Sequence, residues 1–341
     1  MNISVILPTY RRNCQEELNN LHNYDKYMST NQFGEEFKQL YDKYVKDAIH
    51  ILNPTIWCLL YQTFKDFEIV LCHKYPEDLD NLVRDYIIPK SKDEINLGSV
   101  ISYKGKIGKV IGIKEKDSIW HKLGDYATVN NNRNTGIINA IGELLFFLDD
   151  MTIFNENLLQ TVWDNYKDGY YTTCKAIKRI KIIDDKIIGT EKMKGNEGND
   201  IPNTATWTYG MSVSMKECLK IGGMDEIWDG SFGGTDTDFG RRLAQVSRYK
   251  RKLGPTIYEF SHYAEQKKRK KTRDDEIFRQ ICRQSPVPKH IVANSWKPTD
   301  SERLIYKKWH ESTIGELDKN WDKFMDVELF DMKKERSKLN G

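Results

Sequence analysis

The chain has 341 residues, which is enough for one large domain with an appendage or for two smaller domains. Its 53 basic and 50 acidic residues give a formal net charge of +3, so the charge alone creates no general attraction to nucleic acid. It has no apolar run of about 18 residues and no signal-peptide pattern at its start, and its six cysteines show no metal-ligand spacing. These features predict a cytoplasmic protein with free thiols and no transmembrane segment.

The front of the chain alternates strand and helix patterns, which is typical of an α/β fold. In chain order we expect strands at 3–7, 67–72, 144–148 and 170–176, and helices at 49–62, 77–88, 132–142, 155–166 and 239–246. Glycine, lysine and β-branched residues alternate across 93–125, which favours a hairpin, and a second hairpin is expected around Asp184 and Asp185. The stretch 189–206 is rich in Gly, Asn and Thr and is predicted to be a loop.

Composition also divides the chain. Residues 13–48 are polar and form a long excursion between the first strand and the first predicted core helix, so we interpret them as an insertion, together with about 93–125. Beyond residue 262 the composition changes, and 266–273 holds six basic residues in eight. We therefore predict a main domain over 1–264 and a basic, mainly helical carboxyl-terminal region over 265–341.

Two acidic patches carry the chemistry. The apolar run Phe146–Leu148 stops at Asp149 and Asp150, the pattern of a buried strand that delivers carboxylates to the carboxyl edge of a sheet, where open α/β folds bind ligands. About 75 residues later, Gly222-Gly223-Met224-Asp225-Glu226 leads into Gly233-Gly234-Thr235-Asp236-Thr237-Asp238 and a helix. Two acidic clusters beside regular elements indicate a site for a hard cation and an anionic substrate.

Five segments stand in order along the chain: Ser4-Val5-Ile6-Leu7-Pro8-Thr9-Tyr10-Arg11-Arg12, Gln62-Thr63-Phe64-Lys65-Asp66-Phe67-Glu68-Ile69-Val70, Arg133-Asn134-Thr135-Gly136-Ile137, Phe147-Leu148-Asp149-Asp150 and Gly222 to Arg242. Together they resemble the family 2 glycosyltransferases, which have the GT-A fold. The last segment is similar to the carboxyl half of galactosyltransferase-type catalytic domains. The resemblance covers roughly 1–12 and 49–265 and implies a Rossmann-like, mixed but mainly parallel sheet flanked by helices, with a helical carboxyl-terminal appendage.

The resemblance also implies a divalent cation, Mn²⁺ or Mg²⁺, that neutralises the diphosphate leaving group. Asp149 and Asp150 would bind it, and His262 matches the place of a metal-binding histidine in the family. The family's usual third-position acid is Met151 here, and a thioether is a poor ligand for these ions. The alternative is that the two aspartates only cap the following helix.

By the same alignment Asp236 is the base that takes the acceptor proton, and Thr235 replaces the family's preceding glutamate. Asp236 and Asp238 could instead stabilise the first turn of the helix, with Thr235 as its N-cap. Asp225 and Glu226 either contact the acceptor or brace the loop.

The remaining implied contacts are those of the two substrates. Donor contacts are assigned to Pro8, Thr9, Tyr10, Arg11, Arg133 and Asp149, and aromatic acceptor contacts to Trp207 and Trp228, which could equally be core residues. The family's base-reading aspartates are absent, and His73 stands in that region, so a UDP-sugar is only the default donor.

Three functions remain open. The first is a metal-dependent, inverting glycosyltransferase, a hexosyltransferase-type enzyme that moves a sugar from a nucleotide-sugar to a hydroxyl of a glycan or glycoconjugate. The second keeps this mechanism but transfers to hydroxylated bases of DNA, which the basic run 267–273 permits. The third is a non-catalytic sugar- or nucleotide-binding relative, which the departures at Met151 and Thr235 favour.

Overall fold

The computed structural model describes most of the chain up to residue 260 and a few segments beyond it. The described residues are 1–9, 15–29, 33–73, 109–118, 120–121, 128–173, 177–183, 186–192, 208–230, 235–251, 254–260, 300–301, 304, 307–308, 310–311 and 331–340.

The helices and strands alternate along the chain. They are β1 (Ile3–Thr9), α1 (Gln15–His22), α2 (Asp25–Met28), α3 (Glu35–Tyr44), α4 (Asn53–Leu60), β2 (Phe67–His73), β3 (Lys109–Lys114), α8 (Val129–Asn139), β4 (Leu144–Phe147), β5 (Thr152–Ile153), α9 (Leu158–Asp164), β6 (Tyr170–Thr173), β7 (Ile177–Ile183), β8 (Lys186–Lys192), β9 (Met211–Ser214), α10 (Met215–Lys220), the 3-10 turn η2 (Glu226–Trp228), α11 (Thr235–Val246), β10 (Arg248–Arg251), β11 (Ile257–Phe260) and α16 (Met332–Asn340).

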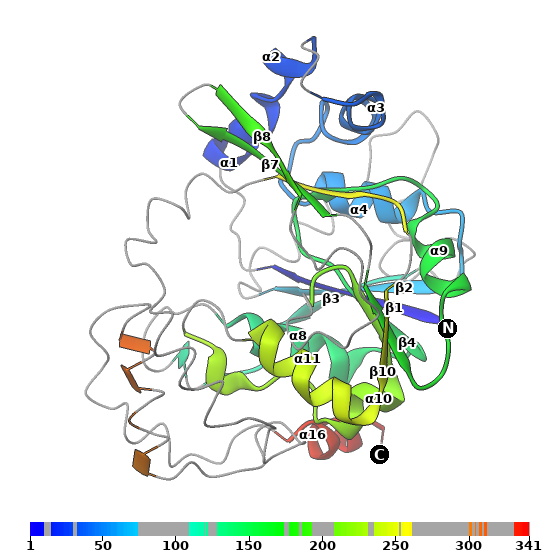
Figure 1. Ribbon diagram of the computed structural model, residues 1–341, viewed down its shortest axis with the longest axis vertical. Coiled ribbons are helices and arrows are strands. Elements are labelled where there is room, and N and C mark those ends of the chain that lie inside the picture. Colours follow the sequence, from blue (N-terminus) through cyan, green and yellow to red (C-terminus); the bar gives the residue numbers. More distant parts are fainter. Residues whose placement is uncertain are drawn as a thin grey trace.

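The centre of the molecule is a seven-stranded sheet with the order β10-β6-β9-β4-β1-β2-β3 (Figure 1). Strand β1 pairs in parallel with β2 and β4, β2 with β3, and β6 with β10, whereas β9 is antiparallel to both of its neighbours. The predicted α/β class, with a mixed and mainly parallel sheet flanked by helices, is confirmed. A helix, α16, also lies near the carboxyl terminus.

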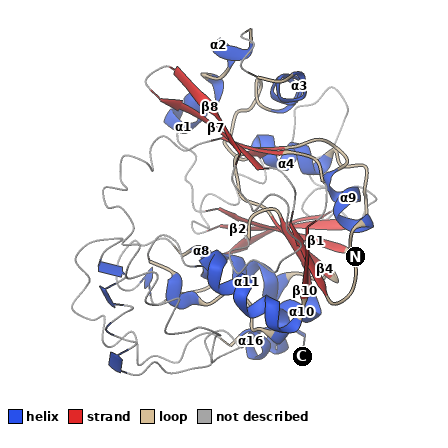
Figure 2. Ribbon diagram, viewed as in Figure 1, coloured by secondary structure: helices blue, strands red, loops and turns tan. Residues whose placement is uncertain are grey.

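Both faces of the sheet are covered by helices (Figure 2). Because strand side chains alternate between faces, Val5 and Leu7 of β1 join one hydrophobic cluster and Ile6 joins the other. The first cluster includes residues of α3, α4 and α9, and the second includes residues of α8, α10, α11 and α16. Burial on both faces explains why β1, β2 and β4 read as continuous apolar runs in the sequence.

A second sheet, with the order β5-β11-β7-β8, lies beside the first cluster. The insertion after β1 packs onto this sheet. The Tyr24 hydroxyl donates to the Ile180 carbonyl at 2.9 Å, and the Phe37 ring lies 5.2 Å from that of Tyr258. The hydroxyl of Tyr258 in turn donates to Glu36 at 2.9 Å. The described part of the insertion is therefore a packed layer of helices rather than a detached excursion.

One local prediction differs in part from the structure, and another is only partly covered by it. Of the hairpin expected over 93–125, the structure describes 109–118 and 120–121, where β3 pairs in parallel with β2 as the last described strand of the main sheet. The rest of the expected hairpin lies outside the described residues. Local alternation identifies a strand but not its partner, and a parallel partner is distant in sequence. The first residues of the predicted loop at 189–206 are instead in a strand, because 189–192 belong to β8. The expected hairpin around Asp184 and Asp185 is confirmed by the antiparallel pair of β7 and β8.

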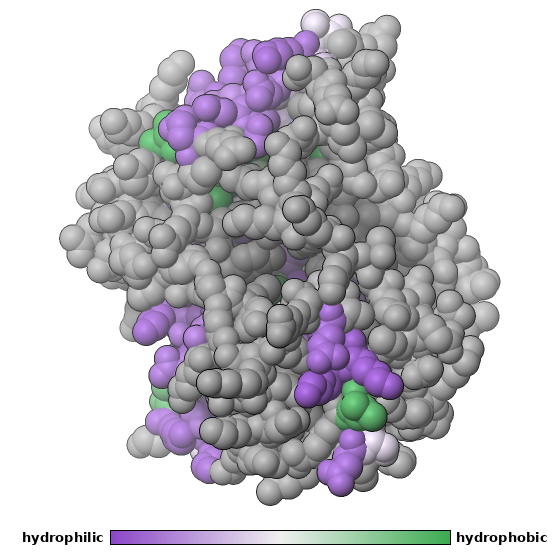
Figure 3. All heavy atoms as spheres, turned by 90° about the vertical axis from the view of Figure 1, so that its left-hand side faces the viewer, coloured by the Kyte–Doolittle hydropathy of each residue, from purple (hydrophilic) through white to green (hydrophobic). Residues whose placement is uncertain are grey.

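Several predictions fall outside the described residues: the helix at 77–88, the loop at 193–206, the basic run 267–273 and most of the carboxyl-terminal region. Among described helices, none has the length and apolar character needed to cross a membrane. The described side chains visible in Figure 3 are mostly hydrophilic, with small hydrophobic patches. Cys58, Cys72 and Cys218 are free and buried.

Candidate active site

The strand order of the main sheet reverses at β1. The chain moves outward from β1 to β2 and β3, and then crosses to the other side of β1 to form β4. In open α/β sheets, ligands bind outside the carboxyl ends of the strands at such a reversal. Pairing with β4 ends at Ile6, whereas pairing with β2 continues to Thr9, so the two partners of β1 diverge at this end. Pro8 and Thr9 line the point of divergence.

Both acidic residues after β4 are held by side chains from other elements. The Thr9 hydroxyl donates to Asp150 Oδ2 at 2.9 Å, and Arg133 Nη2 donates to Asp149 Oδ1 at 2.9 Å. Asp150 is 6% exposed, whereas the Asp149 side chain is 37% exposed. Oδ2 of Asp149 has no hydrogen bond within the described chain. Asp149 therefore presents an oriented carboxylate oxygen to solvent, and Asp150 is fixed behind it.

Helix α8 brings the polar groups of the site together. Its first turns carry Asn132, whose amide donates to the Thr9 carbonyl at 3.2 Å, and Arg133. Gly136 lets the helix approach the sheet, because a Cβ there would lie 2.7 Å from Ile6 Cγ2. Asp229 accepts hydrogen bonds from the backbone N–H groups of Asn130 and Asn131, at 2.7 and 2.9 Å. A protein carboxylate thus already occupies two amides that could otherwise bind a phosphate.

Asp236 lies in the first turn of α11 and faces the same cluster. Its Oδ1 accepts hydrogen bonds from the backbone N–H and the hydroxyl of Thr208, at 3.1 and 2.5 Å. Arg133 Nη1 is 4.0 Å from the same oxygen. The side chain is 41% exposed, and its Oδ2 has no hydrogen bond within the described residues. One oxygen is anchored and the other is available, the arrangement that a general base needs.

Arg133 therefore joins the end of β4 to the start of α11. It contacts Asp149 and approaches Asp236, and its own side chain is only 7% exposed. These contacts bring together residues that the sequence assigned to different roles. Arg133 links the predicted donor residue Asp149 to the predicted base Asp236, and the predicted donor residue Thr9 bonds to the predicted metal ligand Asp150. Strands β1 and β4, which carry Thr9 and lead to the two aspartates, are neighbours in the sheet.

The described part of the glycine-rich loop, residues 222–230, is held by contacts from Lys116 and from α8. Glu226 is 7% exposed; its Oε1 accepts from Asn134 Nδ2, and its Oε2 pairs with Lys116 Nζ, both at 2.8 Å. Asp225 caps η2 by accepting the Ile227 N–H at 3.1 Å, and Trp228 is 5% exposed. Of the two roles left open for Asp225 and Glu226, these contacts favour bracing, and Trp228 packs as a buried residue.

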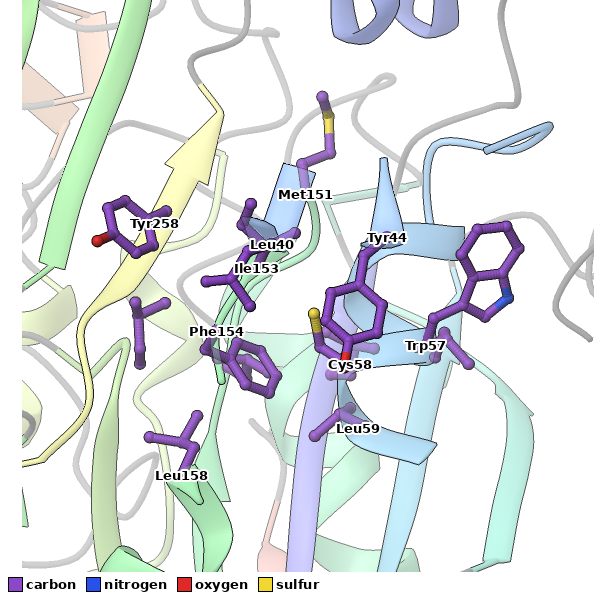
Figure 4. Close-up of a cluster of buried hydrophobic side chains, with 14 of the residues drawn as sticks. Leu40, Tyr44, Trp57, Cys58, Leu59, Met151, Ile153, Phe154, Leu158 and Tyr258 are labelled. Atoms are coloured by element: carbon purple, nitrogen blue, oxygen red, sulfur yellow. The ribbon is translucent and has the colours of Figure 1, made fainter. Parts of the chain in front are cut away.

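The surroundings of Met151 disfavour an acidic side chain at this position. Its φ is +56°, and it is the one described residue other than glycine with a positive φ. Its side chain is buried in the first hydrophobic cluster (Figure 4), and its carbonyl accepts the Phe260 N–H at 3.0 Å. A carboxylate at this position would enter an apolar core, which is costly. Backbone in this region of φ is concentrated at functional sites.

The described residues contain no group of three or more histidine, cysteine or acidic side chains placed to hold a metal ion. Asp149 and Asp150 supply two hard oxygen donors, which suit Mg²⁺ or Mn²⁺. His262 lies outside the described residues, although β11 ends two residues before it and Phe260 touches the Met151 backbone. Tyr10, Arg11 and Trp207 also lie outside the described residues.

Sequence reasoning missed several residues that build this site. Thr208 anchors Asp236, Asp229 caps α8, and Asn132 and Asn134 tie α8 to β1 and to the glycine-rich loop. One signal was available. Four asparagines, two just before the predicted helix 132–142 and two inside it, are unfavourable for an isolated helix, and all four are completely buried in α8: Asn130, Asn131, Asn132 and Asn134.

The pKa of Asp225 predicts a pH-dependent stability. Burial, together with the nearby Asp238, raises the pKa of this carboxyl from 3.8 to about 7. The folded state therefore holds a proton that the unfolded state releases near pH 4, so this group's contribution to stability falls as pH rises from about 4 to about 7. Asp225→Asn keeps the cap oxygen and should gain stability relative to wild type over that range, measured by urea unfolding at pH 5, 6, 7 and 8.

Asp168→Asn, at a side chain that is 66% exposed, serves as the control and should show no such trend. A difference between Asp225→Asn and wild type that is constant across pH would contradict the assignment.

Comparisons with known proteins give structural likeness but no family. No protein-family model matches the chain, and no curated protein matches it. The structure resembles S. aureus TarS 1–349 in complex with UDP-GlcNAc, with 14% identity, 91% of this chain and 72% of that chain covered, and a TM-score of 0.45. It also resembles GalNAc-T7 with UDP, GalNAc and Mn²⁺, with 12% identity, 96% and 56% coverage, and a TM-score of 0.44. At these values the likeness assigns no activity, and the function must be argued from the residues of this chain.

Proposed function

We propose that the chain is a GT-A-type glycosyltransferase that moves a sugar from a nucleotide-sugar donor to a hydroxyl group of a carbohydrate or glycoconjugate. The observation that carries the proposal is the position of Arg133. It lies within 2.9 Å of Asp149 at the donor edge of the sheet and 4.0 Å from Asp236 at the start of α11. Donor and acceptor chemistry would meet around this side chain.

The proposed reaction is a single displacement with inversion at the sugar carbon, an assignment that comes from the sequence resemblance. The acceptor oxygen attacks the anomeric carbon, and Asp236 Oδ2 takes the hydroxyl proton. The bond between the anomeric carbon and the phosphate oxygen breaks, and its electron pair leaves with the nucleoside diphosphate. The Thr208 contacts hold Oδ1, which fixes the direction of Oδ2. A base positioned in this way contributes on the order of 10²–10⁴-fold to rate.

Charge control on the donor side would come from Arg133 and a divalent cation. Asp149 and Asp150, with His262, are the residues proposed to hold Mn²⁺ or Mg²⁺. When bound, this ion would neutralise the charge on the diphosphate as it leaves. Asp149 is accessible and oriented, and the Thr9 hydroxyl orients Asp150, so both carboxylates fit a hard cation. The amides at the start of α8 are bonded to Asp229, which leaves the cation and Arg133 as the proposed phosphate partners.

A thermal-shift screen tests the donor proposal. Nucleoside diphosphates and nucleotide-sugars are added with and without Mn²⁺. A ligand at one hundred times its Kd stabilises the folded state by about 2.7 kcal/mol. A metal-dependent rise in Tm with one nucleotide family would support a donor site and would identify the substrate for turnover assays. No rise with any donor would favour a relative that binds no nucleotide-sugar, and binding without turnover would favour a non-catalytic relative.

The metal ligands are tested separately by Mn²⁺ titration. Asp149→Ala and His262→Ala should each weaken Mn²⁺ binding at least roughly tenfold, because each removes one of few protein ligands. Asp168→Ala removes an exposed carboxylate away from the β4 end and is the matched control. Unchanged Mn²⁺ affinity in both test variants would exclude the proposed ligand set.

A further inference from the structure

The helix α16 contacts the end of α8 that lies away from the candidate site. Arg336 Nη1 donates to the carbonyls of Ile137, Ile138 and Ala140, at 2.9, 3.1 and 2.8 Å. The last carbonyls of a helix have no partner within the helix, and a cation is favourable near them because of the helix dipole. A side chain from the far end of the sequence therefore caps α8.

The sequence of helix α8 has a low intrinsic helix propensity. Its eleven residues, VNNNRNTGIIN, include four asparagines before Gly136 and only one strong helix former, Arg133. Side chains from other elements bond to both ends: the Asp229 carboxyl accepts from the first amides, and the Arg336 guanidinium donates to the last carbonyls. The conformation of α8 thus depends on contacts from outside the helix rather than on its own sequence.

The same helix α16 supports the glycine-rich loop. Met332 is 1% exposed and belongs to the second hydrophobic cluster. A Cβ built on Gly223 would overlap its Cε, so the loop backbone lies directly on this side chain. Asn134 of α8 completes the contact, because its amide donates to the Met224 carbonyl and its oxygen accepts the Met224 N–H, both at 2.9 Å. Helix α16, helix α8 and the loop therefore pack as one unit.

We propose that α16 is a positioning element of the active site, and that Arg336 is its principal positioning residue. By capping α8, Arg336 fixes the axial position of Arg133, four residues before Ile137 and therefore about 6 Å away along the helix. Arg133 must satisfy Asp149 and Asp236 together, and catalytic geometry tolerates errors of only about 0.5 Å. The effect on transfer rests on the proposed function, whereas the support of α8 does not.

The test compares Arg336→Met, Arg336→Lys and Lys338→Met in the full-length protein. Lys338 lies on the same helix, is 58% exposed and bonds only to Glu335 among the described contacts, so its variant makes the same change of charge without touching α8. Amide hydrogen exchange is measured for α8 and, as an internal reference, for β1 and β2. Donor kcat and KM are measured alongside Tm.

We expect Arg336→Met to speed exchange in α8 roughly tenfold or more relative to β1 and β2, and to lower kcat/KM roughly tenfold or more. Arg336→Lys should recover part of both losses, because the charge and some donors remain. Lys338→Met should resemble wild type. Unchanged α8 exchange in Arg336→Met would overturn the proposal, as would an equal effect of Lys338→Met.

This experiment distinguishes the support of α8 by Arg336 from the effect of that support on sugar transfer. If wild type neither binds nor turns over any nucleotide-sugar, the proposed function fails, and selective exchange in α8 still decides whether Arg336 supports this helix. If wild type is active and α8 exchange rises in Arg336→Met without any change in kcat or KM, the positioning role is overturned and the proposed function stands.

Discussion

Asp236→Asn is expected to reduce sugar transfer by on the order of 10²–10⁴-fold while leaving donor binding nearly unchanged. The asparagine keeps an oxygen that can accept the two hydrogen bonds from Thr208, so the side chain stays in place. It has no carboxylate to take the acceptor proton. Because the effect falls on the chemical step, kcat should fall while the donor-dependent rise in Tm remains.

Asp238→Asn is the matched control for this variant. It makes the same change two residues later in the first turn of α11, at a carboxylate that pairs with Arg242 at 2.7 Å rather than with Arg133. This control should cost stability, through loss of a partner for the buried Arg242, but it should retain most of the transfer activity of the folded enzyme. Loss of donor affinity in Asp236→Asn, or retention of its transfer activity, would refute the assignment of the base.

The central strands were predictable because their local pattern is strong. Strands β1, β2 and β4 are buried on both faces, and their apolar runs locate them to within two residues. The predictions 3–7, 67–72 and 144–148 correspond to strands at Ile3–Thr9, Phe67–His73 and Leu144–Phe147. Parallel order then follows from the alternation with helices. The pairing of β3 with β2 was not predicted, since it joins residues far apart in sequence.

Within the site, the sequence located the charged groups but not the residues that hold them. Asp149, Asp150 and Asp236 follow recognisable patterns at the ends of elements. Thr208 lies outside the quoted segments, and Asp229 and Asn134 lie inside them without a role that the motif assigns. Each acts through a contact with a residue at least 28 positions away. Such contacts exist only after the chain has folded, and no local periodicity reports them.

Local sequence patterns also did not decide what each acidic residue does. Glu226 and Asp225 lie in an acidic motif, which predicted contact with an acceptor as readily as bracing. The structure shows both oxygens of Glu226 engaged by Lys116 and Asn134. Burial and hydrogen bonding therefore distinguish Glu226, which holds the scaffold, from Asp149 and Asp236, whose side chains remain more than one-third exposed.

Arg133→Met is expected to have the second large effect. The variant removes the cation that bonds to Asp149 and lies near Asp236, and hydrogen bonds to charged groups are each worth about 1.5–3 kcal/mol. We expect kcat/KM to fall by roughly 10- to 100-fold for each such interaction that is lost in the transition state. Donor KM should rise and kcat should fall, since the proposed contacts lie on both substrates.

Arg133→Lys distinguishes the role of the positive charge from that of the planar guanidinium. Lysine keeps the charge but lacks the planar fork that can face two carboxylates, so Arg133→Lys should recover only part of the kcat/KM that Arg133→Met loses. Full recovery in Arg133→Lys would show that charge alone is sufficient. Unchanged kcat and KM in Arg133→Met would show that Arg133 takes no part in transfer, and the link between the donor edge and α11 would then be structural only.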